Sequence, residues 1–418
     1  MSELESTQSR DHLLQEISAL RQQVADLKIV QTDLELLQEV TTEHSDDVLA
    51  ELEHKNQLIR KIFGRYLTDE VVTTLLDSPA ALKLGGERCM VSILVADLRG
   101  FTALSEYLSA EDVIKVLNWY LGHMTDVITR YDGIINDLTG DGLMVLFGAP
   151  TVRNDDAQRA VTCAIAMQLA MDTVNLKLDE WGLPRLQMGI GINTGEAVVG
   201  NIGSEKHTKY SAIGKQVNLA YRIESYTVGG QVLISGQTLE LVKPLVIVDE
   251  RIQIIPKGLS QPITVFSLKG IRDDDALVLP HEEQLLRRLP VPVFVQFVLL
   301  DGKQMSGKVW PGQIIKLSSR GAELSLQSSD NRMPPLVPMS DLKLNLFLGD
   351  RAYSPEIALA NVDLANPQHR SDDIYAKVLH KDELSHTVFI YFTTIRPAEA
   401  DYLKKRYEAL GRDQQKVN

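Results

Sequence analysis

The chain has 418 residues, enough for two or three domains, and its 44% apolar and 24% charged residues are ordinary for a globular protein. A formal net charge of −13 argues against a protein that binds nucleic acid without sequence preference, although it leaves room for one nucleotide pocket. The two cysteines, Cys89 and Cys163, exclude a disulfide framework and a cysteine-based zinc site, which fits a reducing compartment. Because no apolar run approaches about 20 residues and the N-terminus is polar, we expect a cytoplasmic protein without a membrane span or signal peptide.

Residues 11–62 carry a heptad repeat and contain no glycine or proline. Its most regular positions are Leu13, Leu20, Leu27 and Leu34. This spacing predicts an α-helical coiled coil. Polar residues such as Gln31 and Gln38 in the middle of the seam fit either a register switch or a marginal coil. A helix that packs on its own domain is the alternative. Where the heptads stop, residues 63–87 are expected to form a joint to the next domain.

Residues 88–270 alternate apolar strand patterns with helical ones. The expected elements are a strand at 90–96, a helix at 110–130, hairpin strands at 133–137 and 142–147, a helix at 155–178 and a strand at 186–193. We expect a turn at Thr194-Gly195, after which residues 197–200 pair back. Strand, helix, hairpin, helix, strand is the order of a ferredoxin-like α+β sandwich.

The remainder of the chain has a different pattern. Residues 271–286 are rich in acidic residues and are expected to be a linker. Residues 287–418 contain short runs of alternating apolar residues and then a charged helical stretch. These runs are at 291–299, 307–310, 321–326 and 388–392, and the helix is expected at 398–410. The pattern predicts a small β-barrel with a C-terminal helix.

Two aspartates are candidates for a metal site in the α+β region. Asp97 ends the first strand and Asp141 lies in the hairpin turn, so pairing of the strands would bring the two carboxylates together. With a backbone carbonyl, for which Leu98 is the candidate, they could hold a pair of Mg²⁺ ions against a triphosphate. The alternative for Asp141 is that it simply serves the turn.

Four motifs resemble those of the class III nucleotidyl cyclases. They read DLRGFT at 97–102, GDG at 140–142, GINTG at 191–195 and GKQVNLAYR at 214–222. The resemblance implies a ferredoxin-like catalytic domain that converts a nucleoside triphosphate into a 3′,5′-cyclic monophosphate and pyrophosphate. It also implies two Mg²⁺ or Mn²⁺ ions per site, and sites shared across a head-to-tail homodimer. The coiled coil would then set how the two halves meet.

The family's residue roles transfer to matching positions of this sequence. Asp97 and Asp141 would bind the metals, Asn218 would orient the ribose, and Arg222 would stabilise charge on the α-phosphate. Lys257 would bind phosphate. By the same analogy, the aspartates of one chain face Asn218 and Arg222 of the other. The resemblance thus predicts an enzyme, whereas a catalytically degenerate cyclase fold that acts as a signalling scaffold is the alternative.

The two family positions that read the purine are Asp137 and Ser211, and they match neither the adenine nor the guanine pattern. An ionised aspartate only accepts hydrogen bonds, which favours guanine, because adenine N1 is itself an acceptor. The expectation that a cyclase of bacterial appearance makes cyclic AMP favours adenine instead. On that ground we rank ATP first and GTP or relaxed selectivity second. Basic residues near Lys209 could contact the triphosphate tail, or could belong to a solvated loop.

The C-terminal third resembles a PilZ domain more weakly. The sequence KLSSRG at 316–321 keeps the serine and glycine of one signature, while Arg287-Arg288 stand where the family has two arginines four residues apart. The resemblance implies cyclic di-GMP as a possible ligand. A barrel that contacts a regulatory protein is the preferred interpretation.

Overall fold

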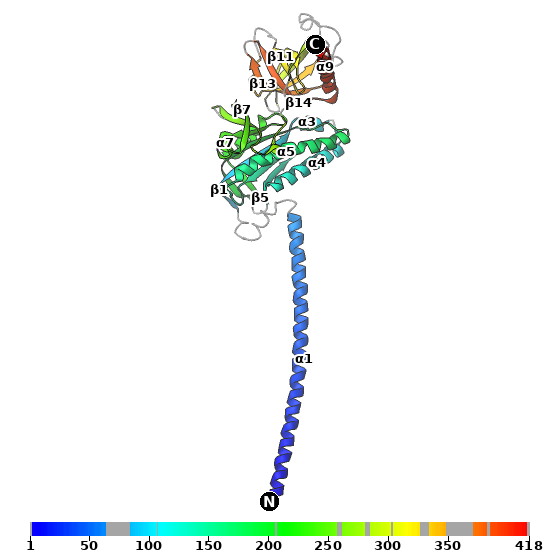
Figure 1. Cartoon of the computed structure of the whole chain (residues 1–418), viewed down its shortest axis with the longest axis vertical. Coiled ribbons are helices and arrows are strands. Elements are labelled where there is room, and N and C mark those ends of the chain that lie inside the picture. Colours follow the sequence, from blue (N-terminus) through cyan, green and yellow to red (C-terminus); the bar gives the residue numbers. More distant parts are fainter. Residues whose placement is uncertain are drawn as a thin grey trace. The chain divides into compact units, whose positions relative to one another are not determined.

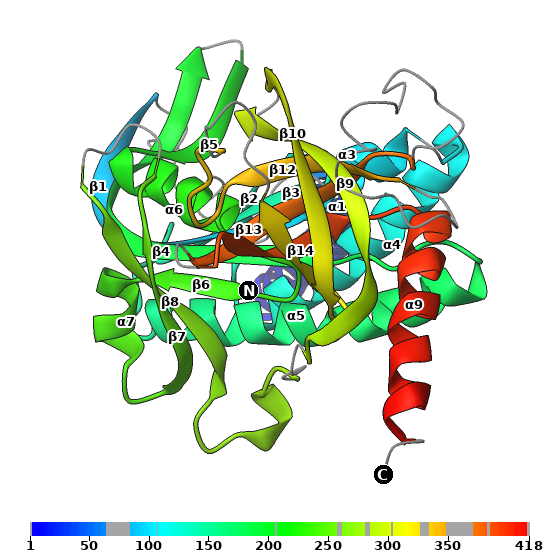
Figure 2. The same ribbon diagram turned by 90° about the horizontal axis from the view of Figure 1, so that it is seen from above.

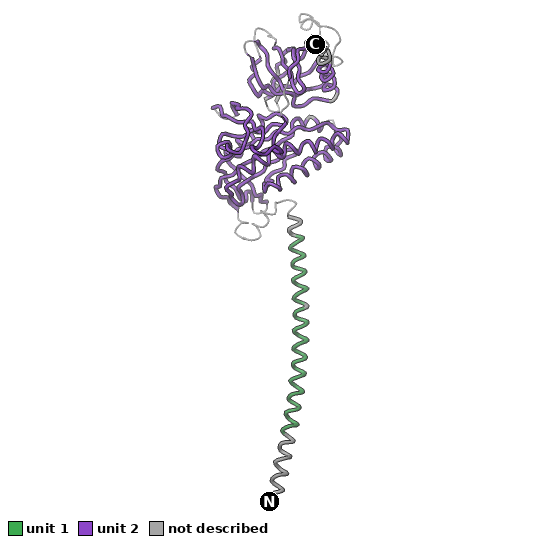
Figure 3. Tube along the Cα trace, in the orientation of Figure 1, with its two compact units in different colours: residues 1–77 green, residues 78–418 purple. Residues whose placement is uncertain are grey.

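The structure is a computed structural model that describes residues 2–63, 84–106, 108–204, 207–256, 261–280, 285–301, 304–326, 334–347, 371–382 and 385–415. The chain divides into two compact units, residues 1–77 and 78–418 (Figure 3). Most of the predicted joint, as residues 64–83, lies outside the described residues.

The first unit is described as one long helix, α1 (Ser2–Phe63), drawn in blue in Figure 1. Three leucines of the heptad are exposed, with Leu20 at 53%, Leu27 at 67% and Leu34 at 63%. The predicted helix is therefore present, and its apolar stripe is available to a partner helix. Its pairing into a coiled coil stays a prediction. Among the described residues, no helix combines the length and apolar character needed to cross a membrane.

The second unit begins with an α+β sheet whose strands follow the order β2-β3-β1-β4-β6-β8-β7, with β5 paired to β4. The strands are β1 (Gly85–Leu98), β2 (Ile134–Thr139), β3 (Gly142–Phe147), β4 (Met188–Ser204), β5 (His207–Ile213), β6 (Val232–Ser235), β7 (Val246–Ile254) and β8 (Ile263–Ile271). The helices are α3 (Phe101–Ser105), α4 (Ala110–Arg130), α5 (Asp156–Glu180), α6 (Lys215–Ser225) and α7 (Gly236–Val242), and a 3₁₀ turn covers Asp275–Leu277.

The apolar side chains of β1 alternate between the two faces of this sheet, as the twofold period of a strand requires. Leu94, Ala96 and Leu98 join the main core under α4 and α5, which lie side by side in Figures 1 and 2. Ile93 and Val95 face the opposite side, where they join a smaller core with residues of α6. From Val91 to Leu98 the strand is therefore buried on both faces, apart from Asp97, which is partly exposed near its end.

The predicted turn at Thr194-Gly195 is wrong, because β4 continues without interruption through Ser204. Thr194 and Gly195 pair with Ser92 and Val91 of β1, and the Thr194 and Ser92 hydroxyls are 2.8 Å apart. Gly195 serves close packing instead of a turn, since a Cβ there would lie 2.7 Å from the Gln216 side chain. The strand that pairs back is β5, which begins at His207.

Six described strands of the second unit close into an antiparallel barrel in the order β10-β11-β14-β13-β12-β9. They are β9 (Arg287–Asp301), β10 (Gln304–Leu317), β11 (Gly321–Leu326), β12 (Asp341–Leu346), β13 (Ile374–Asp382) and β14 (Thr387–Thr394). Helix α9 (Pro397–Gln415) follows and contacts β9. The predicted barrel with its C-terminal helix is confirmed, while β12 and β13 had no sequence prediction.

Candidate functional site

The structure brings Asp97 and Asp141 together at one end of the sheet. Asp97 is the penultimate residue of β1, and Asp141 lies between β2 and β3. Since Ala96 pairs with Leu143 in the antiparallel β1–β3 ladder, the next residue of β1 reaches the hairpin turn. A Cβ on Gly142 would lie 3.4 Å from Asp97 Oδ1. The hairpin thus positions the second carboxylate beside the first.

The charge of Asp97 makes the ionisation of Asp141 more costly. Burial and the charge of Asp97 raise the pKa of Asp141 to about 6, against hydrogen bonds from backbone N–H groups that include that of Leu98. Burial likewise raises the pKa of Asp97, which the nearby Arg99 lowers. Two half-buried like charges at one spot are stabilised by a cation placed between them.

These residues fit a divalent metal. Hard cations prefer carboxylate and carbonyl oxygens, and Mg²⁺ in particular is bound through one or two carboxylates, water and substrate phosphates. Within the described ranges, no group of three or more histidine, cysteine, aspartate or glutamate side chains could hold a metal. The two aspartates would therefore need further oxygen ligands, and the Leu98 carbonyl and a phosphate are suitable ones.

Arg99 anchors the segment that follows Asp97. Its guanidinium forms an ion pair with Glu224 of α6, and both side chains are about nine-tenths buried, with 10% and 9% exposed. The same guanidinium lies 3.8 Å from Asp97 Oδ2. The Arg99 backbone N–H donates to the Gln187 carbonyl over 2.7 Å. Asp97 is thus tied to α6 through one buried arginine.

Helix α6 carries both Asn218 and Arg222, which lie one turn apart on the same face. The Asn218 side chain is exposed and that of Arg222 is half-buried. Among the described residues, neither side chain forms a hydrogen bond or ion pair within the chain. Both are therefore available to a ligand or to another chain.

Two residues of the GINTG motif explain how α6 is held on β4. A Cβ on Gly191 would lie 2.3 Å from the Glu224 backbone nitrogen, so only glycine permits this approach. The buried Asn193 donates to the Gln216 carbonyl and to its side-chain oxygen, each over 2.9 Å. The motif thus fixes both ends of the helix that bears Arg222.

Asp137 of β2 and Ser211 of β5 lie on two strands that contact each other, which their motif positions alone did not indicate. Asp137 Oδ1 is 2.7 Å from Lys209 Nζ, and both side chains are partly exposed. The Ser211 hydroxyl donates to Asn136 Oδ1 over 3.2 Å, and the Asn136 amide donates to the Tyr210 carbonyl over 2.7 Å. The basic segment near Lys209 therefore supplies a partner for Asp137.

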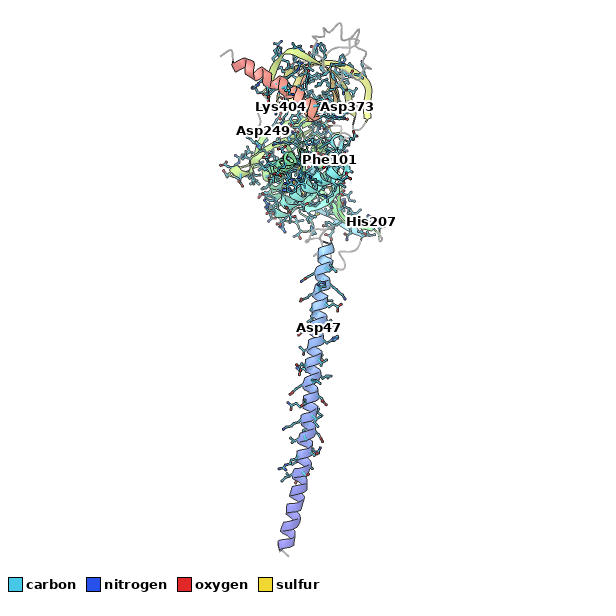
Figure 4. The ribbon with its side chains drawn as sticks, turned by 90° about the vertical axis from the view of Figure 1, so that its right-hand side faces the viewer. Asp47, Phe101, His207, Asp249, Asp373 and Lys404 are labelled. Carbon is cyan, nitrogen blue, oxygen red and sulfur yellow. The ribbon has the colours of Figure 1, made fainter. Side chains whose placement is uncertain are left out.

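This region borders α6 in the same chain. Burial and, secondarily, the charge of Asp137 raise the pKa of Tyr221, which lies on α6 between Asn218 and Arg222. The hairpin formed by β4 and β5 extends away from the loop that follows Asp97. Figure 4 shows His207, the first residue of β5, and Phe101, the first residue of α3, on opposite sides of the α+β domain. Lys257, the expected phosphate-binding lysine, lies outside the described residues.

The barrel brings the two halves of its weak signature together on neighbouring strands. Arg288 of β9 pairs with Lys316 of β10. However, the Arg287 guanidinium lies 4.4 Å from the Tyr407 ring centroid, and Lys316 forms a 2.7 Å ion pair with Glu323. Arg287 and Lys316 therefore already have partners in the chain.

Comparison with known proteins assigns the α+β part to a family. The family described as the adenylate and guanylate cyclase catalytic domain matches residues 87–270. Those residues belong to this cyclase family. The match includes all four motifs and every predicted site residue of the α+β part, and it ends before β9.

Named relatives of the cyclase domain include enzymes of both base specificities. Adenylate cyclase 1 of Rhizobium meliloti is 29% identical over 211 residues, which are 50% of this chain and 32% of that protein. The solved guanylyl cyclase Cya2 is 53% identical, with a TM-score of 0.46, and covers 47% of this chain and 100% of its own. The adenylyl cyclase CyaB of P. aeruginosa is 37% identical, with a TM-score of 0.45, and covers 46% of this chain and 99% of its own.

The chain spans about a third of the length of the curated relatives that it matches. The family and these relatives are named as adenylate and guanylate cyclases, which are enzymes that act on nucleotides.

Proposed function

We propose that this chain is a homodimeric nucleotide cyclase that converts ATP to cyclic AMP and pyrophosphate in signal transduction. The observation that carries the proposal is the convergence of Asp97 and Asp141 at the end of β1, where two half-buried carboxylates lie side by side and a cation would offset their charges. Asn218 and Arg222, on a helix tied to the same loop through Arg99 and Glu224, supply the complementary polar groups.

In this mechanism Asp97, Asp141 and the Leu98 carbonyl would hold two Mg²⁺ or Mn²⁺ ions. Bound there, the ions would supply activation of the 3′-hydroxyl and neutralisation of the triphosphate. Asn218 orients the ribose by hydrogen bonding. The planar guanidinium of Arg222 donates to the α-phosphate oxygens, where charge develops during in-line attack, and Lys257 contacts the phosphate tail. No covalent intermediate is needed, because positioning and charge stabilisation supply the catalysis.

The site is shared between two chains. Asp97 and Asp141 of one protomer face Asn218 and Arg222 of the other, so a symmetric dimer has two equivalent sites. Within the described part of their own chain, the Asn218 and Arg222 side chains are unpaired, which supports this arrangement. Pairing of α1 through its exposed leucines would hold the two protomers together.

The ion pair between Asp137 and Lys209 supports ATP as the first choice of substrate. Alone, the Asp137 carboxylate would repel adenine N1, because both are hydrogen-bond acceptors. The Lys209 ammonium group, 2.7 Å from Asp137 Oδ1, supplies the missing donor for N1 and leaves a carboxylate oxygen for the N6 amino group. GTP is the alternative, since the same pair could donate to guanine O6 and accept from its N1–H.

Assays of the purified full chain with Mg²⁺ or Mn²⁺ and each of the four nucleoside triphosphates test the activity and the base together. We expect cyclic AMP as the main product. Lys209→Met should lower kcat/KM for ATP by about tenfold or more, the usual effect of losing a charged hydrogen bond. A main product of cyclic GMP would reverse the base assignment. No cyclic product from any of the four would favour a degenerate signalling scaffold.

A further inference from the structure

The barrel contacts the cyclase domain at the loop that follows Asp97. Thr394, the last residue of β14, lies against Gly100, where a Cβ would come within 1.5 Å of the Thr394 hydroxyl oxygen. Gly100 has φ of 69°, a left-handed conformation in which glycine is strongly preferred. Helix α3, which follows this glycine, also contacts β14. The loop that leaves the first metal-binding aspartate is therefore packed directly against the barrel.

A second contact reaches the C-terminal end of α6. Lys377 of β13 is only 4% exposed, and its ammonium group donates to the Ser225 carbonyl. It also lies 3.6 Å from Asp341 Oδ1 of β12. The carbonyls of a helix's last turn lack partners within the helix and carry partial negative charge, so a buried cation stabilises them. Arg222 belongs to the same last turn, and the Ser225 hydroxyl donates to its carbonyl over 2.8 Å.

The two contacts are linked through a network around one buried ion pair, because Gly100 follows Arg99 and Ser225 follows Glu224. The ion pair between Arg99 and Glu224 connects the Asp97 loop to the last turn of α6. On its flank, the Tyr391 hydroxyl of β14 lies 3.3 Å from the Gly229 carbonyl and 3.4 Å from Gln187 Oε1. The carbonyl of Gln187 in turn accepts the Arg99 backbone N–H. The barrel thus touches the loop that follows Asp97, the last turn of α6 and the segments at Gln187 and Gly229.

From this network we propose that Lys377 is a positioning residue for the cyclase reaction. It acts from the barrel through the C-terminal carbonyls of α6, and it sets the direction from which Arg222 reaches the partner's site. The barrel is then a structural part of both active sites of the dimer. Whatever binds to the barrel and shifts β13 or β14 would change catalysis through the same contacts.

The test compares the full-length Lys377→Met variant with wild type in steady-state kinetics. Because Arg222 acts on charge that develops in the transition state, we expect kcat to fall by about tenfold or more while KM for the nucleotide changes less than about twofold. Lys377→Arg, which keeps a cationic donor, should restore part of kcat. Lys404→Met is the matched control, because Lys404 is an exposed lysine on α9 of the barrel, labelled in Figure 4, and its loss should leave both constants unchanged.

The kinetic readout rests on the proposed function, so a second measurement is independent of activity. Hydrogen–deuterium exchange of the same full-length variants should be faster at residues 215–225, which form α6, in Lys377→Met than in wild type. The barrel should stay as protected as in wild type. A folded Lys377→Met protein with wild-type kcat and unchanged exchange in α6 would overturn the proposal. Exchange that rises throughout the barrel would also overturn it, because it would indicate a role in folding alone. If wild type makes no cyclic nucleotide, the exchange result still decides whether Lys377 holds α6.

Discussion

Asp97 and Asp141 are a costly pair in the metal-free protein. Their raised pKa values mean that ionisation costs more in the folded state than in the unfolded state, so at neutral pH their charges oppose folding. A sequence that keeps such a pair at the end of a buried strand gives up stability for a cation site. The stability of the metal-free protein and its response to metal should therefore change in opposite directions when one charge is removed.

Asp97→Asn tests this opposition. We expect the melting temperature in EDTA at pH 7.5 to rise, because the repulsion is removed, while the increase caused by millimolar Mn²⁺ disappears and activity falls at least about a hundredfold. Differential scanning fluorimetry with and without Mn²⁺ gives both temperatures. Asp249→Asn, at an exposed aspartate on β7, is a control for loss of charge. A variant that keeps the Mn²⁺-induced increase would show that Asp97 does not bind the metal.

At the scale of elements, the position of α6 on β4 depends on Gly191. This glycine lies beneath the Glu224 backbone, and no side chain fits between the two. The helix carries Asn218 and Arg222, and non-covalent contacts such as the Arg99–Glu224 ion pair hold it beside the loop that follows Asp97. Small displacements of α6 should therefore affect catalysis more than they affect the fold.

Gly191→Ala is expected to lower the free energy of unfolding by about 1 to 3 kcal/mol, the usual cost of overpacking. It should also lower kcat by a larger factor than the smaller fraction of folded protein would explain. Urea denaturation and steady-state kinetics at a temperature where the variant is folded measure the two effects. Gly122→Ala on α4, where an added Cβ meets nothing within 4 Å, is the control. Unchanged kinetics in Gly191→Ala would contradict a precise placement of α6.

Elements with a clear period were predictable from the sequence, and contacts distant along the chain were not. The helix Ala110–Arg130 was predicted with its observed ends, because its N-cap Ser109 and its apolar spacing are local signals. Thr194-Gly195 was misread, because a glycine that permits close packing looks the same as one in a turn. The pairs Arg99–Glu224 and Asp137–Lys209 join elements far apart in the sequence, and no spacing rule indicates them.

At the scale of the whole molecule, three features converge on one requirement. The α1 leucines whose side chains are described are exposed, and the polar groups of Asn218 and Arg222 are unpaired within the described part of their own chain. The aspartates proposed to bind metal need a partner for the phosphate that they would hold. The proposed head-to-tail dimer satisfies all three requirements at once. In this proposal the barrel contributes from within each protomer, through Lys377 and Thr394, to the half-sites that the dimer would combine.

The shared site is tested most directly by complementation between inactive variants. Asp97→Ala and Arg222→Ala chains, coexpressed with different tags and purified through both, form heterodimers with one intact site. The account predicts about half of the wild-type activity per dimer, while each homodimer is inactive. Heterodimers of Asp97→Ala with Asp141→Ala, which damage the same half-site, should stay inactive. Verified Asp97→Ala/Arg222→Ala heterodimers without cyclic nucleotide production would contradict a site built from two chains.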